Sequence, residues 1–69
     1  MMSFEVCVKY GRNWSYRGIR KANTPRAAAL DESYVSGRKV IRVRPEGSRD
    51  KWLVYRFLYV GTLTSTSGV

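Results

Sequence analysis

The chain has 69 residues, and 13 lysine and arginine side chains against five acidic ones give it a net charge of +8 at pH 7. A chain of this length has room for one domain with a thin core. Because it contains one cysteine and no histidine, it can form no internal disulfide, and it lacks the commonest zinc ligand and the commonest general base. We therefore expect no metal site, no cofactor, and a cytoplasmic location, where thiols stay reduced.

The first third of the chain predicts a β-hairpin. Alternation over Ser3–Tyr10 is typical of a half-buried strand, with an inward row of Phe4, Val6, Val8 and Tyr10. A Gly-Arg-Asn turn follows at 11–13, and Trp14–Arg20 resumes with aromatic and apolar residues, as a second strand would. Cys7 is interpreted as a small buried hydrophobe. The first six residues show no charged segment before an apolar stretch, so we expect no signal peptide.

A helix is predicted next. Thr24 is a good N-cap residue, and Pro25 suits the first helical position, where its missing N–H costs nothing. The run Ala-Ala-Ala-Leu at 27–30 favours helix, and Gly37 is well placed to end it. The apolar stripe predicted to face the sheet consists of Ala27, Leu30 and Tyr34.

Two further strands are predicted, Val40–Arg44, which ends at Pro45, and Trp52–Val60. A polar turn at 46–50 joins them. Two hairpins around one helix predict an α+β fold of order ββαββ, a small antiparallel β-sheet with one helix packed on one face. We expect residues 1–60 to form a single domain and residues 61–69, which lack packing side chains, to form a flexible tail.

Alternation along the last two strands predicts which side chains face away from the helix. Ile41 and Val43 would face it, and the opposite row would be Arg38, Val40, Arg42 and Arg44. Both rows of the fourth strand carry large side chains, so its buried face stays open. One row is Leu53, Tyr55, Phe57 and Tyr59, and the other is Trp52, Val54, Arg56, Leu58 and Val60. A partly apolar, arginine-rich open sheet is typical of a binding surface.

Most of the basic residues are arginine, whose planar fork grips carboxylate or phosphate. The predicted partner-binding residues are Arg38, Lys39, Arg42, Arg44, Trp52 and Arg56. A secondary basic patch is predicted on the first hairpin, from Lys9, Arg12, Arg17, Arg20 and Lys21. No acidic residue interrupts the stretches 9–26 and 38–44, so we expect something outside the protein to neutralise them.

The residues predict neither a catalytic site nor a small-molecule substrate. No nucleophile-elbow serine and no glycine-rich phosphate loop is present. The adjacent Asp31 and Glu32 would point in two directions on a helix, so they are interpreted as a solvated face rather than an acid/base pair. The longest apolar run, 52–60, contains Arg56 and is too short to cross a bilayer, so we expect no membrane partner.

The segment Lys21–Pro45 carries a recognisable pattern. It has a helix start Ala22-Asn23-Thr24, alanine-rich turns at 27–30, a helix end Glu32-Ser33-Tyr34-Val35, then Gly37 and the strand Val40-Ile41-Arg42-Val43-Arg44-Pro45. This pattern resembles the small inhibitor of host RNA polymerase made by T-odd coliphages. The resemblance implies a phage protein that docks its arginine strand on an acidic part of the polymerase β′ jaw, inside the DNA channel, and blocks transcription initiation. It implies that Arg42 and Arg44 make the contact.

Two alternatives stay open. The first is direct, largely sequence-independent DNA or RNA binding through phosphate contacts, with base stacking on Trp14, Tyr16, Trp52, Tyr55 or Tyr59. No recognised nucleic-acid-binding module is present, so the inhibitor hypothesis is preferred. The second is a small virion or assembly protein whose apolar fourth strand pairs with another copy.

Overall fold

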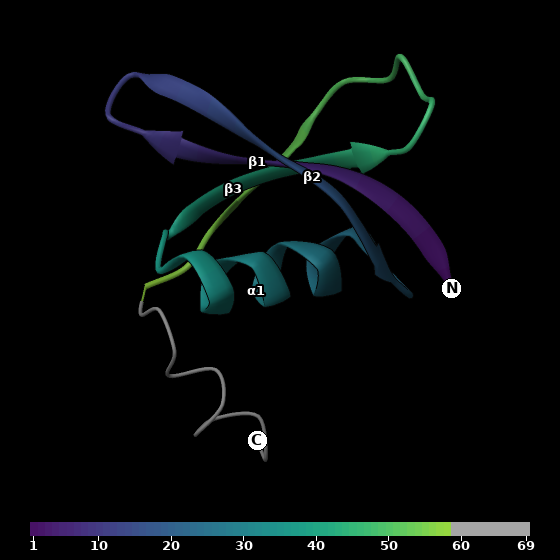
Figure 1. Cartoon of the computed structure of the whole chain (residues 1–69), viewed down its shortest axis with the longest axis horizontal. Helices are drawn as coiled ribbons and strands as arrows, with labels where there is room; N and C mark the ends of the chain where they lie inside the picture. The colour runs from purple at the N-terminus through teal and green to yellow at the C-terminus, as the bar shows by residue number, and fades with distance from the viewer. Residues whose placement is uncertain (59–69) are drawn as a thin grey trace.

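The computed structural model describes residues 1–58 and confirms the predicted α+β fold (Figure 1). The elements are β1 (Met2–Tyr10), β2 (Asn13–Ala22), α1 (Pro25–Ser36), β3 (Val40–Pro45) and β4 (Leu53–Arg56). The four strands form one antiparallel sheet in the order β2-β1-β3-β4. Helix α1 lies on one side of this sheet (Figure 1). The predicted tail at 61–69 and the predicted end of the fourth strand, Tyr59 and Val60, fall outside the described residues.

The core lies between α1 and the two central strands. It consists of Phe4, Val6, Val8, Ile41, Val43, Ala28 and Ala29. The predicted inward rows of β1 and β3 are therefore confirmed, except that Tyr10 is exposed where β1 ends. Cys7 is buried and free, as expected, although it belongs to the row that faces away from the helix. None of the helices in the described part is long and apolar enough to cross a membrane.

The helix begins and ends where its capping residues predict. Thr24 has extended backbone, and its hydroxyl accepts a hydrogen bond from the Ala27 N–H at 3.1 Å. Pro25 occupies the first helical position. Gly37 ends the helix in the left-handed region, at φ 77°, and its N–H donates to the Ser33 carbonyl at 3.0 Å. Both ends are therefore specified by local sequence.

Thr24→Ala is expected to lower the free energy of unfolding by about 1 kcal/mol, because it leaves the N–H of Ala27 without its side-chain acceptor. Urea denaturation followed by tryptophan fluorescence measures the loss. Thr24→Ser, which retains the hydroxyl, should stay within about 0.5 kcal/mol of wild type. Equal stabilities of the alanine and serine variants would show that the cap contributes nothing.

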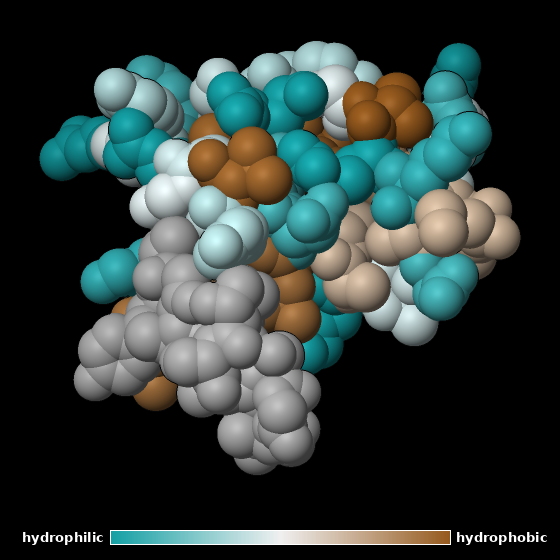
Figure 2. All heavy atoms as spheres, turned by 60° about the horizontal axis from the view of Figure 1, so that its bottom comes forward, coloured by the Kyte–Doolittle hydropathy of each residue, from teal (hydrophilic) through white to brown (hydrophobic). Residues whose placement is uncertain are grey.

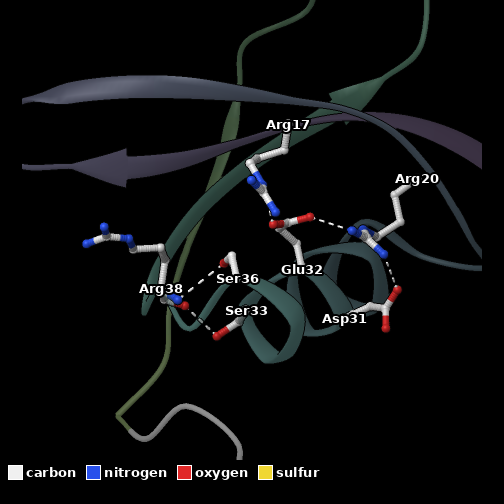
Figure 3. Close-up of polar contacts among 7 residues, drawn as sticks. All are labelled: Arg17, Arg20, Asp31, Glu32, Ser33, Ser36 and Arg38. Carbon is white, nitrogen blue, oxygen red and sulfur yellow. Dashed lines mark hydrogen bonds and ion pairs between the residues drawn. The ribbon is translucent and has the colours of Figure 1, made fainter.

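The predicted apolar stripe of the helix is wrong. The buried helix residues are Ala28, Ala29, Glu32 and Ser33, whereas Ala27 and Tyr34 are exposed and Leu30 is half-buried. The helix face that packs against the sheet is thus shifted around the helix axis by about one residue position from the predicted stripe. The two small alanines let the helix approach the sheet closely, and the buried polar residues find partners. The Ser33 hydroxyl donates to the Arg38 carbonyl at 2.6 Å (Figure 3).

The fourth strand is shorter than predicted, and its faces are now assigned. Among the described residues it extends only to Arg56. Arg56 pairs with Val40, which is the first residue of β3, so β3 offers no further strand residue for pairing. The Phe57 N–H still donates to the Lys39 carbonyl at 2.8 Å. Tyr55 and Phe57 pack against the core, so their row faces the helix.

Candidate binding face

The sheet face opposite α1, which we call the open face, collects most of the predicted binding residues. Strand pairing places on it Glu5, Cys7, Lys9, Trp14, Tyr16, Ile19, Lys21, Val40, Arg42, Arg44, Val54 and Arg56, with Trp52 alongside. Five of these side chains are cationic, and Glu5 is the one acid that the described residues contribute. Of the predicted partner-binding residues, the structure brings together Arg42, Arg44, Arg56 and Trp52.

Cations and aromatic rings contact one another in a row across the open face, which we call the cation–aromatic ladder. The Arg42 guanidinium carbon lies 4.6 Å from the centroid of the Trp14 ring and 4.4 Å from that of Trp52. The Arg44 guanidinium carbon lies 4.2 Å from the Trp52 centroid, and the Lys9 ammonium lies 5.0 Å from that of Trp14. Each such contact stabilises by about 0.5–1 kcal/mol at a partly exposed site. The ladder therefore restricts both arginines before any partner binds.

Strand register explains why these residues meet. Lys9 lies opposite Trp14 in the first hairpin, and Arg42 lies opposite Cys7 on the next strand. Cys7 is small, and its side chain is buried in the middle of this face. A long side chain at its position would compete with the ladder for space. The small residue thus leaves room for Trp14 and Arg42 to meet across it.

The two ladder arginines differ in their polar contacts. The Nε of Arg44 donates to Glu5 Oε2 at 3.3 Å. The Nε of Arg42 is buried and has no hydrogen-bond partner within the described part of the chain. Guanidinium groups bind carboxylate or phosphate through two parallel N–H donors. The open face can therefore bind an anion through arginines whose positions are already restricted.

Arg38 and Lys39 do not join the ladder, which corrects the prediction that Arg38 lines up with the arginines of β3. Both residues precede β3, where strand alternation does not yet apply. The Arg38 guanidinium carbon lies 3.8 Å from the centroid of the Tyr10 ring. Tyr10 belongs to the row of β1 that alternates into the core. Lys39 is exposed, and its carbonyl receives the Phe57 N–H.

The predicted secondary basic patch does not form one surface. Lys9 and Lys21 lie on the open face, Arg12 is exposed in the turn after β1, and Arg17 and Arg20 lie on the helix side. The reason is a β-bulge, because Val6 pairs with Gly18 and Cys7 pairs with Tyr16, so Arg17 has no partner on β1. A bulge breaks the alternation of a strand. Gly18 adopts φ 102° there, a backbone conformation that favours glycine.

Arg17 and Arg20 instead form an ion cluster around the buried Glu32, and Arg20 also pairs with the exposed Asp31, both acids being on α1 (Figure 3). Glu32 is 0% exposed. Its Oε2 accepts from the Nε of Arg17 at 2.8 Å, its Oε1 accepts from a terminal nitrogen of Arg20, and Arg20 also donates to Asp31 at 2.7 Å. The interpretation of both acids as a solvated face is therefore wrong for Glu32. Part of the basic charge is neutralised from inside the protein, not from outside.

The cluster also stabilises the charged form of Arg20. Burial by itself lowers the pKa of the Arg20 guanidinium, but hydrogen bonds to Glu32 and Asp31 and the negative charges of these acids outweigh burial and raise the pKa above its ordinary value. Arg20 consequently remains charged at any pH at which the protein is handled. The ion pairs cannot be lost through deprotonation of this arginine.

The helix-bearing side offers a weaker candidate surface. With the bottom of Figure 1 brought forward, hydrophobic residues form separate groups among hydrophilic ones (Figure 2). Tyr34 and Val35 are more than half exposed on the helix, but no series of cation–aromatic contacts is found there among the described residues. The open face is therefore the better candidate.

Sequence reasoning missed the contributions of Glu5 and Trp14 to the site. The sequence predicts Trp14 only as a platform for base stacking, yet pairing of the first hairpin through its short turn places it opposite Lys9. No group of three or more His, Cys, Asp or Glu side chains in the range 1–58 could hold a metal ion. Comparison of the chain with protein-family models, with curated proteins and with solved structures finds no match.

Proposed function

We propose that this protein is a phage-type, non-enzymatic inhibitor that acts in the host cytoplasm. In this proposal it binds an acidic surface of a host protein of nucleic-acid metabolism through the open face, and RNA polymerase is the first candidate. The observation that carries the proposal is the stacking of Arg42 and Arg44 on Trp52 on the uncovered side of the sheet. An arginine that is already held in place loses less side-chain entropy when it binds a partner.

The composition of the ladder favours a protein partner over bases. Tryptophan, tyrosine and arginine are the residues that most often dominate the energy of protein–protein interfaces. The ring of Trp52 is contacted by both Arg42 and Arg44, and that of Trp14 by Lys9 and Arg42. These cations compete with any base that would stack on the same rings. Carboxylates, in contrast, can reach the arginines without displacing the aromatic contacts.

The resemblance of Lys21–Pro45 to the coliphage inhibitor supports RNA polymerase as the partner. The strand that the resemblance implies for docking is β3, and its Arg42 and Arg44 belong to the open face. A basic protein of this size that binds acidic residues inside the DNA channel would block the path of the template. Inhibition would then require no chemistry by the protein itself.

Affinity capture from a bacterial lysate tests this proposal. The wild-type protein is expected to retain RNA polymerase after nuclease treatment, and the double variant Arg42→Ala/Arg44→Ala is expected to retain none. Each capture is repeated at high salt, where contacts with nucleic acid weaken most. Loss of every captured protein on nuclease treatment would contradict the proposal.

Direct nucleic-acid binding is the second candidate, and the charge of the open face favours it. Among the described residues the open face carries five cationic side chains and one acidic one, and this excess of positive charge suits phosphate contacts. If this candidate is right, removal of Lys9, Lys21 or Arg56 should weaken binding about as much as removal of Arg42. Each removal should lower the salt slope by roughly one unit. Pairing of β4 with another copy is less favoured, because this strand spans only four of the described residues and carries Arg56.

A further inference from the structure

Glu5 lies beside Arg44 on the open face. It is directly opposite Arg44 in the antiparallel pairing of β1 with β3. Its Oε2 accepts from the Nε of Arg44 at 3.3 Å, and the side chains of Glu5 and Arg44 are only 19% and 27% exposed. The neighbouring Arg42 has no such carboxylate within the described residues. Of the two arginines in the ladder, Arg44 is therefore already paired with a carboxylate of the protein itself, and Arg42 is not.

The contact between Glu5 and Arg44 is longer than the other ion pairs of the described residues. Arg17 contacts the buried Glu32 at 2.8 Å, and Arg20 contacts the exposed Asp31 at 2.7 Å. Charge-assisted hydrogen bonds between nitrogen and oxygen commonly span about 2.7–2.9 Å, so 3.3 Å indicates a weak bond. Glu5 lies on β1, whereas Arg44 lies on β3, and the Glu5 side chain makes no other hydrogen bond among the described residues. A well-placed external carboxylate can therefore displace it.

We propose that Glu5 is an internal competitor for the anionic group that a partner presents to Arg44. The inference rests on the proposed function and adds a selectivity device to the same face. In the free protein Glu5 pairs with Arg44, and on docking the partner's carboxylate takes its place. A partner that also binds Arg42 offsets the free energy that is lost when Glu5 leaves Arg44. A ligand that offers a single anion does not, and it also meets the negative charge of Glu5.

Glu5→Gln tests this inference, with Glu46→Gln as the matched control. Both variants remove one negative charge, but Glu46 is exposed in the turn after β3 and forms no ion pair among the described residues. The probes are purified bacterial RNA polymerase and fluorescein-labelled polyglutamate. Glu5→Gln is expected to bind both about two- to fivefold more tightly than Glu46→Gln at low salt. The difference should shrink as salt screens the pair.

Glu5→Thr, a neutral residue that suits a strand, is a second variant and should show the same gain. The NMR signal of the Arg44 Nε–H should shift in both Glu5 variants and not in Glu46→Gln. If the wild type binds the probes and the Glu5 variants bind no more tightly than Glu46→Gln, the inference is overturned and the proposed function stands. If the wild type binds neither probe, the proposed function fails, and this inference fails with it.

Discussion

Glu32→Gln is expected to lower the free energy of unfolding by about 3 kcal/mol. Removing one partner of a buried ion pair costs roughly 3–5 kcal/mol, because the remaining charges stay desolvated without compensation. We expect the low end of this range. Arg20 would still pair with Asp31, and the side chain of Arg17 is 42% exposed and can reach water. A 69-residue protein has a total stability of only roughly 3–10 kcal/mol, so the variant is expected to be partly unfolded at moderate temperature.

The cost is concentrated at the contact between α1 and β2. The helix-facing row of β2 carries Gly18 and Arg20, with Arg17 added by the bulge, and it contributes only Ala22 to the packing around the core. Strand β2 is also an edge strand, and within residues 1–58 it pairs with β1 alone. Glu32 therefore replaces the apolar contacts that usually attach an edge strand to a helix. Hydrogen exchange should show the largest loss of protection in β2.

Asp31→Asn is the matched control for Glu32→Gln. It removes the same charge from the adjacent position, but Asp31 is 56% exposed, so the expected loss is about 0.2–1 kcal/mol. Urea denaturation gives both values, and an unchanged m-value would show that both variants unfold from the same compact state. A loss below about 1 kcal/mol for Glu32→Gln would mean that Arg17 and Arg20 rehydrate freely. The cluster would then not be what holds β2 against the helix.

Arg42→Ala is expected to weaken binding to the proposed partner by roughly 30-fold or more, since residues that dominate an interface contribute about 2 kcal/mol or more each. Arg42 is the shared cation of the ladder, because it contacts both Trp14 and Trp52. Its removal therefore takes away an anion-binding group and one of the two cation contacts of each ring, leaving Lys9 on Trp14 and Arg44 on Trp52. Calorimetric titration with RNA polymerase measures the change, and an assay of transcription initiation should show the same order of loss.

Two further variants separate the geometry of Arg42 from its charge. Arg42→Lys keeps the charge but loses the planar fork, so it should bind almost as weakly as Arg42→Ala. Arg26→Ala removes one positive charge from an exposed position in the first turn of α1, on the side away from the open face, and should change affinity less than about twofold. If Arg42→Ala and Arg26→Ala weaken binding equally, the partner senses net charge rather than the ladder. That result would favour nucleic acid.

Local sequence was enough to predict the elements and most of their faces. The ends of the helix follow from Thr24, Pro25 and Gly37, because capping depends on residues only a few positions apart. The inward rows of β1 and β3 follow from alternation, which is a property of one strand at a time. The same rule predicts that Arg42 and Arg44 lie on the face away from the helix. The candidate face was therefore predictable from the sequence, although its full membership was not.

The features that depend on two or more elements at once were decided only by the tertiary structure. The bulge at Arg17 breaks alternation, and it is recognisable only from the pairing of β2 with β1. Glu32 can be buried because Arg17 and Arg20 reach it from another element, and no pattern within the helix shows this. The ladder needs the register of three strands to bring Trp14 beside Arg42. Single-strand and single-helix periodicity assigns a side chain to a face, whereas register and packing between elements assign its neighbours.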